Sequence, residues 1–211
     1  MSDKLLPPSG PGRPKDPAKR QAILEAAKTL FLRHGYDGSS MDAIAAEAGV
    51  SKLTVYSHFT DKETLFSAAV KAKCEEQLPE LLFELAEGVP IETVLLNIGR
   101  GFHALISSRE SIELHRLMVA SAAQDAKLAH IFFAAGPQRV IDEMTDLLGQ
   151  VQRNGLLAID NPHHAAEHFF CLIKGGHNFR LMCGCGESLE ATEADAHVRE
   201  VVELFVRAYQ P

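Results

Sequence analysis

Two short amphipathic segments joined by a glycine constrain this chain more than any other feature. In the first, residues 41–48, Ile44 and Ala45 are spaced to face one side. Gly49 follows where a left-handed residue ends a helix, and Ser51 stands where a side-chain oxygen caps the next helix, residues 52–59. Small residues at this turn let two helices cross closely at a sharp angle, which predicts a helix-turn-helix.

The second of these helices presents different side chains around its axis, at 3.6 residues per turn. If Val55 and Phe59 point into the core, Leu53 and Ser57 point outward. This layout is typical of a helix in the DNA major groove, with central residues facing bases and flanking hydroxyls facing phosphates. Lys62 opens the following helix, where a cation opposes the helix dipole, and a bound phosphate would offset that cost.

The residues that we expect to contact DNA lie on this helix, at its cap and beside it. They are Ser40, Ser51, Lys52, Leu53, Thr54, Tyr56, Ser57, His58 and Lys62. Substitutions at Lys52 or Leu53 are expected to shift sequence preference, whereas Tyr56 and Lys62 are expected to bind phosphates.

Three motifs at fixed spacing extend this interpretation: Ala48-Gly49-Val50-Ser51, Tyr56-Ser57-His58-Phe59 and Lys62-Glu63-Thr64-Leu65. Together they resemble the DNA-binding domain of the TetR/AcrR family of bacterial transcriptional regulators. The resemblance implies a homodimeric repressor that binds palindromic double-stranded DNA and releases it when a small, largely apolar effector binds. It also implies that residues 61–78 join a DNA-binding head to an effector-binding body.

The net charge of −7 argues against nucleic-acid binding, but its distribution reverses that argument. Residues 1–71 hold 10 Lys/Arg against 8 Asp/Glu, and the rest of the chain holds 11 against 20. A mildly basic head on an acidic body would orient the molecule on DNA.

The sequence contains no long apolar run and no apolar leader, so we expect a cytoplasmic protein without a membrane partner. Its four cysteines fit reduced thiols in that compartment.

The expected fold is all-α, with a three-helix head followed by a helical body. Residues 1–16 are expected to be a flexible basic arm, residues 17–62 the helix-turn-helix domain, and residues 63–211 the effector-binding and dimerisation domain. The arm resembles one that touches the DNA backbone or minor groove; a merely solubilising tail is the alternative. The remaining predicted helices span 17–34, 61–78, 80–87, 91–107, 109–122, 126–135, 137–154, 162–182 and 193–209. Capping boxes are expected at Thr60 with Glu63 and at Thr192 with Asp195.

An effector cavity is implied by the resemblance, bounded by the middle helices. The plausible lining residues combine apolar side chains with a few polar groups. They are Asn97, Arg100, Phe102, His103, His115, Leu117, Met118, Phe132 and Phe133. For each of them, ordinary core or surface packing is the alternative.

Two glycines inside the segment 162–182 suggest close approach of another helix, since each costs about 1 kcal/mol relative to alanine. We expect a four-helix bundle between two copies, with packing inside one chain as the alternative. The expected interface residues are Ile141, Met144, Leu148, Phe169, Ile173 and Gly176.

Other classes of function have weaker support in the sequence. A metal- or redox-sensing regulator would use His164 with His168, or Cys183 with Cys185. No complete metal-ligand spacing, phosphate loop or nucleophile motif is present, so we expect no cofactor, no metal and no enzymatic activity. A helical-bundle enzyme is the remote alternative.

Overall fold

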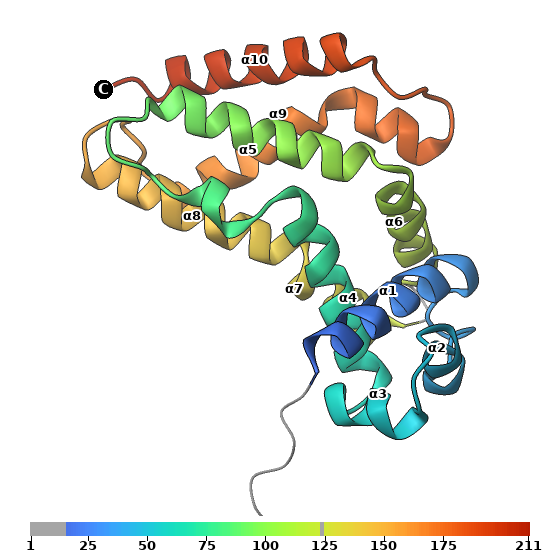
Figure 1. The fold of residues 1–211 in the computed structure, drawn as a ribbon. Helices are drawn as coiled ribbons and strands as arrows, with labels where there is room; N and C mark the ends of the chain where they lie inside the picture. Colours follow the sequence, from blue (N-terminus) through green and yellow to red (C-terminus); the bar gives the residue numbers. More distant parts are fainter. Residues whose placement is uncertain (1–15, 123–124) are drawn as a thin grey trace, which may run out of the picture.

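The computed structural model describes residues 16–122 and 125–211, and every regular element in that part is helical. The predicted all-α fold is therefore confirmed. The elements, drawn in Figure 1, are α1 (Pro17–His34), α2 (Met41–Glu47), α3 (Lys52–His58), α4 (Lys62–Gln77), η1 (Glu80–Phe83), α5 (Ile91–Ser107), α6 (Arg109–Ser121), α7 (Ala126–Ala135), α8 (Pro137–Arg153), α9 (Pro162–Cys183) and α10 (Ala191–Ala208). The predicted arm lies outside the described residues except for Asp16.

The head consists of α1, α2, α3 and the first half of α4, packed around one small core. Phe66 of α4 is the centre of this core, because its ring lies edge-on to Phe31 at 5.2 Å and to Tyr36 at 5.4 Å between centroids. Helix α2 adds Met41, Ile44 and Ala45 to this core, and α3 adds Val55. The short helices α2 and α3 are thus held by few apolar contacts and by their caps.

The body is larger, and its helices α5, α8, α9 and α10 pack side by side at the end of the molecule opposite α3 (Figure 1). Its core brings together Leu95 and Ile98 of α5, Leu147 of α8 and Phe205 of α10, all fully buried. Gly99 permits the closest crossing, since a Cβ there would lie 2.8 Å from Val198. Long helices with broad apolar stripes therefore enclose one continuous core.

Head and body do not separate at the predicted boundary between residues 62 and 63. Leu65, Phe66 and Val70 of α4 belong to the core of the head, and Met118 of α6 and Phe132 of α7 close the same core from the body side. The helix that joins the two regions therefore has its first half built into the head, because its apolar stripe continues past the predicted boundary.

Several predicted helix ends differ from the structure by a few residues. Asp61, rather than Thr60, caps α4 by accepting a hydrogen bond from the Thr64 amide at 2.7 Å. Glu190 and Glu193 form the capping box of α10 that was expected at Thr192 and Asp195. Residues 80–87 hold only the 3-10 turn η1, and α9 contains a break at Gly175, whose φ of 51° favours glycine. No helix in the described part of the chain is long and apolar enough to cross a membrane.

Candidate functional site

Helix α3 lies at the outer end of the head, at the bottom of the molecule in Figure 1. Its N-terminus is fixed by Ser51, whose Oγ accepts a hydrogen bond from the Thr54 amide at 3.1 Å. Ser40 caps α2 in the same way through the Ala43 amide at 3.1 Å. Gly49, with a φ of 65°, makes the turn between the two helices as the sequence predicted. Two short helices thus keep a fixed crossing, because each start is capped.

The side chains of α3 are distributed around its axis as predicted. Val55 is fully buried, whereas Leu53 is 80% exposed and Tyr56 is 42% exposed. Ser57 is exposed and its Oγ donates to the Thr54 carbonyl at 2.7 Å, and His58 is half-buried. A large apolar residue held out in water has no role in the described packing, so Leu53 is free to contact a base or a thymine methyl group.

Lys52 points back toward α2, where its Nζ lies 2.7 Å from Oδ1 of Asp42. The hydrogen bond to Asp42 raises the pKa of Lys52 above its ordinary value, so its charge is retained. Both side chains are more than half exposed, so water and salt weaken this ion pair. A DNA phosphate could therefore replace Asp42 as the partner of Lys52.

Lys62 does not occupy the position expected of a phosphate ligand. Its Nζ donates to the carbonyls of Tyr36 at 2.9 Å and Ser39 at 3.1 Å, and it lies 4.2 Å from the centroid of the Tyr36 ring. The ammonium therefore links the start of α4 to the turn between α1 and α2. A cation in the first turn of a helix is unfavourable because of the helix dipole. For Lys62 the two carbonyls and the face of the Tyr36 ring offset that cost.

Arg20 of α1 is a candidate that the sequence did not single out. Its guanidinium carbon lies 5.3 Å from the centroid of the Phe59 ring, directly after α3. Thirty-nine positions separate the two residues in the chain, so only the packing of α1 against α3 reveals their proximity. No local signal in the sequence distinguishes Arg20 from the other basic residues of α1.

The body contains a small cavity of about 70 Å³ between α4, α5, α6, α7, α8 and α9. We call it the body cavity. Its lining is mainly apolar and includes a few polar side chains. It is formed by Val70, Lys73, Cys74, Phe102, Leu105, Ile106, Ser111, Leu114, His115, Phe132, Gly136, Pro137, Val140 and Lys174. Of the predicted effector residues, only Phe102, His115 and Phe132 reach it.

His115 is the central polar group of the body cavity. Its Nδ1 lies 2.7 Å from the Ser111 carbonyl, which requires a proton on Nδ1, and its ring meets Phe132 edge-on at 5.2 Å. Burial lowers the pKa of His115 below its ordinary value, and the charge of Lys174 acts in the same direction. A neutral ring with Nδ1 protonated leaves Nε2 as a hydrogen-bond acceptor.

The other predicted effector residues lie elsewhere, because the face of a helix cannot be assigned from spacing alone when several partners surround it. Asn97 is exposed, and Arg100 pairs with Asp195 of α10 at 2.7 Å. His103 lies near His177 and His197, with ring centroids 6.5 and 6.2 Å away. Leu117 and Met118 pack against the core of the head, and Phe133 is half exposed on the outer side of α7.

The predicted dimer interface is wrong for most of its residues. Met144, Leu148, Phe169 and Ile173 are fully buried in the core of their own chain, and Ile141 packs against that core. The apolar stripes of α8 and α9 face each other, so they offer little surface to a second copy. Gly176 alone is exposed.

Exposed apolar side chains mark a different face of α9 and α10. Leu172 and Phe179 of α9 and Leu204 of α10 are exposed, and Phe179 is 71% exposed. A Cβ at Gly176 would meet only the Arg180 side chain, at 3.4 Å. Packing inside the chain therefore does not explain a glycine at position 176.

The residues of the metal- and redox-sensing alternative are exposed. Nδ1 of His168 lies 3.2 Å from the Tyr209 hydroxyl, and Cys183 and Cys185 lie at and after the end of α9. Within the described residues, no three His, Cys, Asp or Glu side chains are grouped so that they could hold a metal ion.

Two segments of the chain match protein-family models. Residues 23–69 match the one described as "Bacterial regulatory proteins, tetR family". Residues 93–211 match "AefR-like transcriptional repressor, C-terminal domain". The first match covers the helix-turn-helix, and the second covers more than half of the chain.

Individual proteins resemble the chain over most of its length. The HTH-type transcriptional repressor AcnR of Corynebacterium glutamicum is 39% identical over 193 residues, 89% of this chain and 92% of that protein. A solved TetR-family regulator of Mesorhizobium loti is 31% identical with a TM-score of 0.76, covering 92% of this chain and 97% of that one. The flavonoid-responsive regulator FrrA is 28% identical with a TM-score of 0.72, covering 93% and 99%.

Proposed function

We propose, from the premise that this chain belongs to the TetR family of bacterial regulatory proteins, that it is a homodimeric repressor released from its operator by a small molecule. The chain is a DNA-binding transcriptional regulator and not an enzyme. The observation that carries the proposal is the exposure of Leu53 and Tyr56 on a helix whose other face is buried. We place its action in the cytoplasm, where its operator would lie.

In this proposal α3 enters the major groove, with Leu53 toward the bases and Tyr56 toward a phosphate. Two copies of α3 would enter successive major grooves about 34–36 Å apart on a palindromic site. Lys52 would exchange Asp42 for DNA, and Arg20 would contact the backbone beside the end of α3.

The proposed dimer uses the exposed face of α9 and α10 around Phe179. Burying Leu172, Phe179 and Leu204 against their copies would remove apolar surface from water, and Gly176 would permit close approach of the two chains. Phe179→Asp should therefore give monomers in analytical ultracentrifugation. Val119→Asp on α6 is the control, because Val119 is also 71% exposed and should leave the dimer intact. A dimer that persists in Phe179→Asp contradicts the interface.

Effector binding is proposed for the body cavity. At about 70 Å³ it is far below the ~300–1,000 Å³ of ordinary ligand pockets, so a ligand has to push its walls apart. Gly136 packs against α4 so tightly that a Cβ there would lie 3.1 Å from Val70 and 3.2 Å from Cys74. Expansion would therefore shift α4, whose first half is built into the head. The names of AcnR, a repressor, and FrrA, which responds to flavonoids, support repression and small-molecule release.

The test is a selection of binding sites from random double-stranded DNA with the full chain, followed by affinity titrations. Wild-type protein should select a palindrome. Leu53→Ala should change the selected sequence, and Tyr56→Phe should weaken binding to all sequences by about 1.5–3 kcal/mol, the contribution of one hydrogen bond to a charged group. Leu156→Ala is the control. Leu156 is 43% exposed, like Tyr56, but it follows α8 in the body. Failure to select any sequence contradicts the proposed function.

A further inference from the structure

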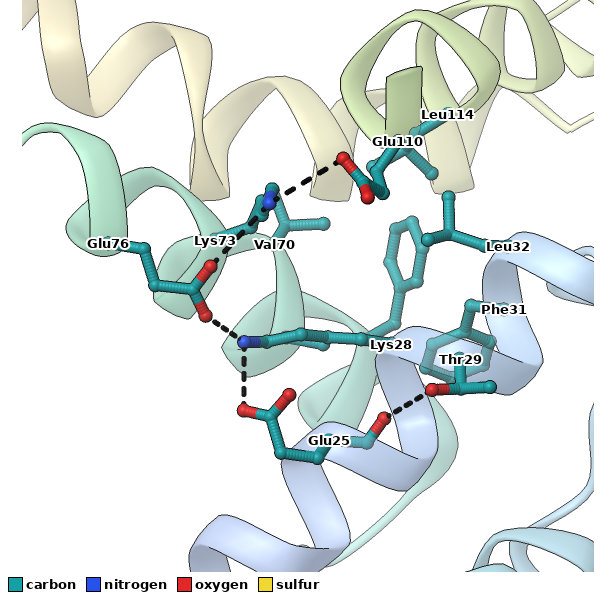
Figure 2. Close-up of a pocket in the computed structure, with 12 residues that line it drawn as sticks. Glu25, Lys28, Thr29, Phe31, Leu32, Val70, Lys73, Glu76, Glu110 and Leu114 are labelled. Atoms are coloured by element: carbon teal, nitrogen blue, oxygen red, sulfur yellow. Dashed lines mark hydrogen bonds and ion pairs between the residues drawn. The ribbon is translucent and has the colours of Figure 1, made fainter. Parts of the chain in front are cut away.

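A second cavity opens where the head meets the body, between α1, α4 and α6. We call it the junction cleft; its charged residues are Glu25, Lys28, Lys73, Glu76 and Glu110, and its volume is about 260 Å³ (Figure 2). Val70, Lys73 and Leu114 line both the junction cleft and the body cavity. The two cavities therefore adjoin across these three side chains.

Their sizes point to a ligand that occupies both. Neither cavity alone reaches the ~300 Å³ at which small-molecule pockets begin, but the two together do. The wall between them is made of side chains on α4 and α6, which can rotate. An elongated molecule could therefore extend from one cavity into the other.

The charges of the junction cleft form one connected chain, which Figure 2 shows from Glu25 to Glu110. Lys28 pairs with Glu25 at 3.0 Å and with Glu76. Lys73 pairs with Glu76 at 3.6 Å and with Glu110 at 3.9 Å. Three carboxylates face two ammonium groups, and the excess is one negative charge. An incoming cation would balance the cleft, whereas an incoming anion would add to the excess.

Two aromatic rings form an apolar part of the junction cleft. Phe31 and Phe66 both line it, and they meet edge-on at 5.2 Å. Both rings are almost fully buried, so the preference of the cleft for a cation rests on its carboxylates. The body cavity differs, because none of its described lining residues is acidic, its charged residues are Lys73 and Lys174, and most of its lining is apolar. A cationic group is therefore favoured only in the junction cleft.

We infer that the effector is an amphiphilic cation, with its apolar end in the body cavity and its ammonium group in the junction cleft beside Glu76 and Glu110. The inference rests on the proposed release of DNA by a small molecule and specifies the site and class of that molecule. The bound cation replaces Lys73 as the partner of Glu110, whose ion pair with Lys73 is long at 3.9 Å. The ligand then contacts α1, α4 and α6 at once and separates the head from α6.

The test is isothermal titration calorimetry on the full chain with three probes that share an eight-carbon tail. They are octyltrimethylammonium, octanoate and octanol. The two ions are kept below the concentration at which they form micelles, and octanol below its solubility limit. The cation should bind at least about tenfold more tightly than octanoate, because like charges disfavour the wrong partner. Octanoate that binds as well as the cation, or three probes that all fail to bind, overturns the inference.

Matched variants on α6 locate the ammonium group. Glu110→Gln should weaken binding of octyltrimethylammonium about threefold, the effect of one half-exposed ion pair. Glu113→Gln should leave it unchanged, because Glu113 pairs with Arg109 at 2.8 Å outside the cleft. Equal affinities of the two variants overturn the assignment, and circular dichroism checks that both remain folded.

The titration contains no DNA, so its outcome does not depend on operator binding. A cation that binds without weakening operator affinity leaves the site intact and contradicts only the role of the cation as the effector.

Discussion

The candidate DNA surface of the head faces outward, whereas the candidate effector site of the body faces inward. In the head, α3 buries Val55 and presents Leu53 and Tyr56 to the outside, so the candidate DNA surface consists of residues that the fold does not need. In the body, Phe102, His115 and Phe132 face inward, so the candidate effector residues are also packing residues. An outward surface can change without loss of stability, whereas an inward site cannot change without altering the core.

The largest expected effect comes from removing one aromatic ring from each core. Phe66→Ala in the head and Phe205→Ala in the body should each lower the free energy of unfolding by about 3–5 kcal/mol, because both rings are almost fully buried and leave a cavity. Urea denaturation at equal protomer concentration measures this. A loss below about 1 kcal/mol for Phe66→Ala would show that the small core does not hold the head.

Substitution of Lys62 distinguishes a structural role of this residue from a role in DNA binding. Lys62→Ala should lower the free energy of unfolding by about 1–3 kcal/mol, because it leaves the carbonyls of Tyr36 and Ser39 without their donor. Lys127→Ala, which removes an exposed pair with Glu63, is the control and should leave the urea midpoint close to that of wild type.

The salt dependence of operator binding separates the two roles of Lys62. Arg20→Ala should reduce the slope of log affinity against log salt concentration by about 0.9, the value for one phosphate contact. Lys62→Ala should leave that slope unchanged while weakening affinity through the displaced turn. A reduced slope for Lys62→Ala would restore the phosphate contact that the sequence suggested.

The smallest expected effect is a pH dependence that arises in the body. The pKa of His115 is lowered by burial from its ordinary value of 6.5, so at a pH below 6.5 the unfolded chain binds more protons at this position than the folded chain. His115 therefore makes stability fall as the pH drops below 6.5. His115→Gln should lose less stability than wild type between pH 7 and pH 5 in urea denaturation.

His130 provides the control for this measurement. Its Nδ1 lies 2.6 Å from the Ala126 carbonyl, the same contact with the preceding turn that His115 makes, but it is exposed on α7. His130→Gln therefore removes an exposed histidine with the same backbone contact, and comparing the two variants isolates the effect of burial at His115. If both variants behave alike, burial of His115 is not the cause.

The parts of the fold that the sequence predicted depend on neighbouring residues. Gly49 and Ser51 determine the turn and the start of α3 through backbone geometry and a cap three residues away, so their roles could be assigned without partners. At the start of α4 two adjacent residues, Thr60 and Asp61, can both act as caps, and the prediction chose the wrong one. Periodicity likewise located the long helices but did not assign a partner to each face.

The sequence by itself determined the all-α fold, the helix-turn-helix and the outward side chains of α3, because a helix period and its caps are local properties of the chain. The tertiary structure alone decided that Met144 and Phe169 pack inside their own chain, that Lys62 binds two backbone carbonyls, and that Arg20 lies beside Phe59. These contacts join residues far apart in the sequence. The pairing of one helix's apolar face with another's depends on how all the helices pack together in the same volume.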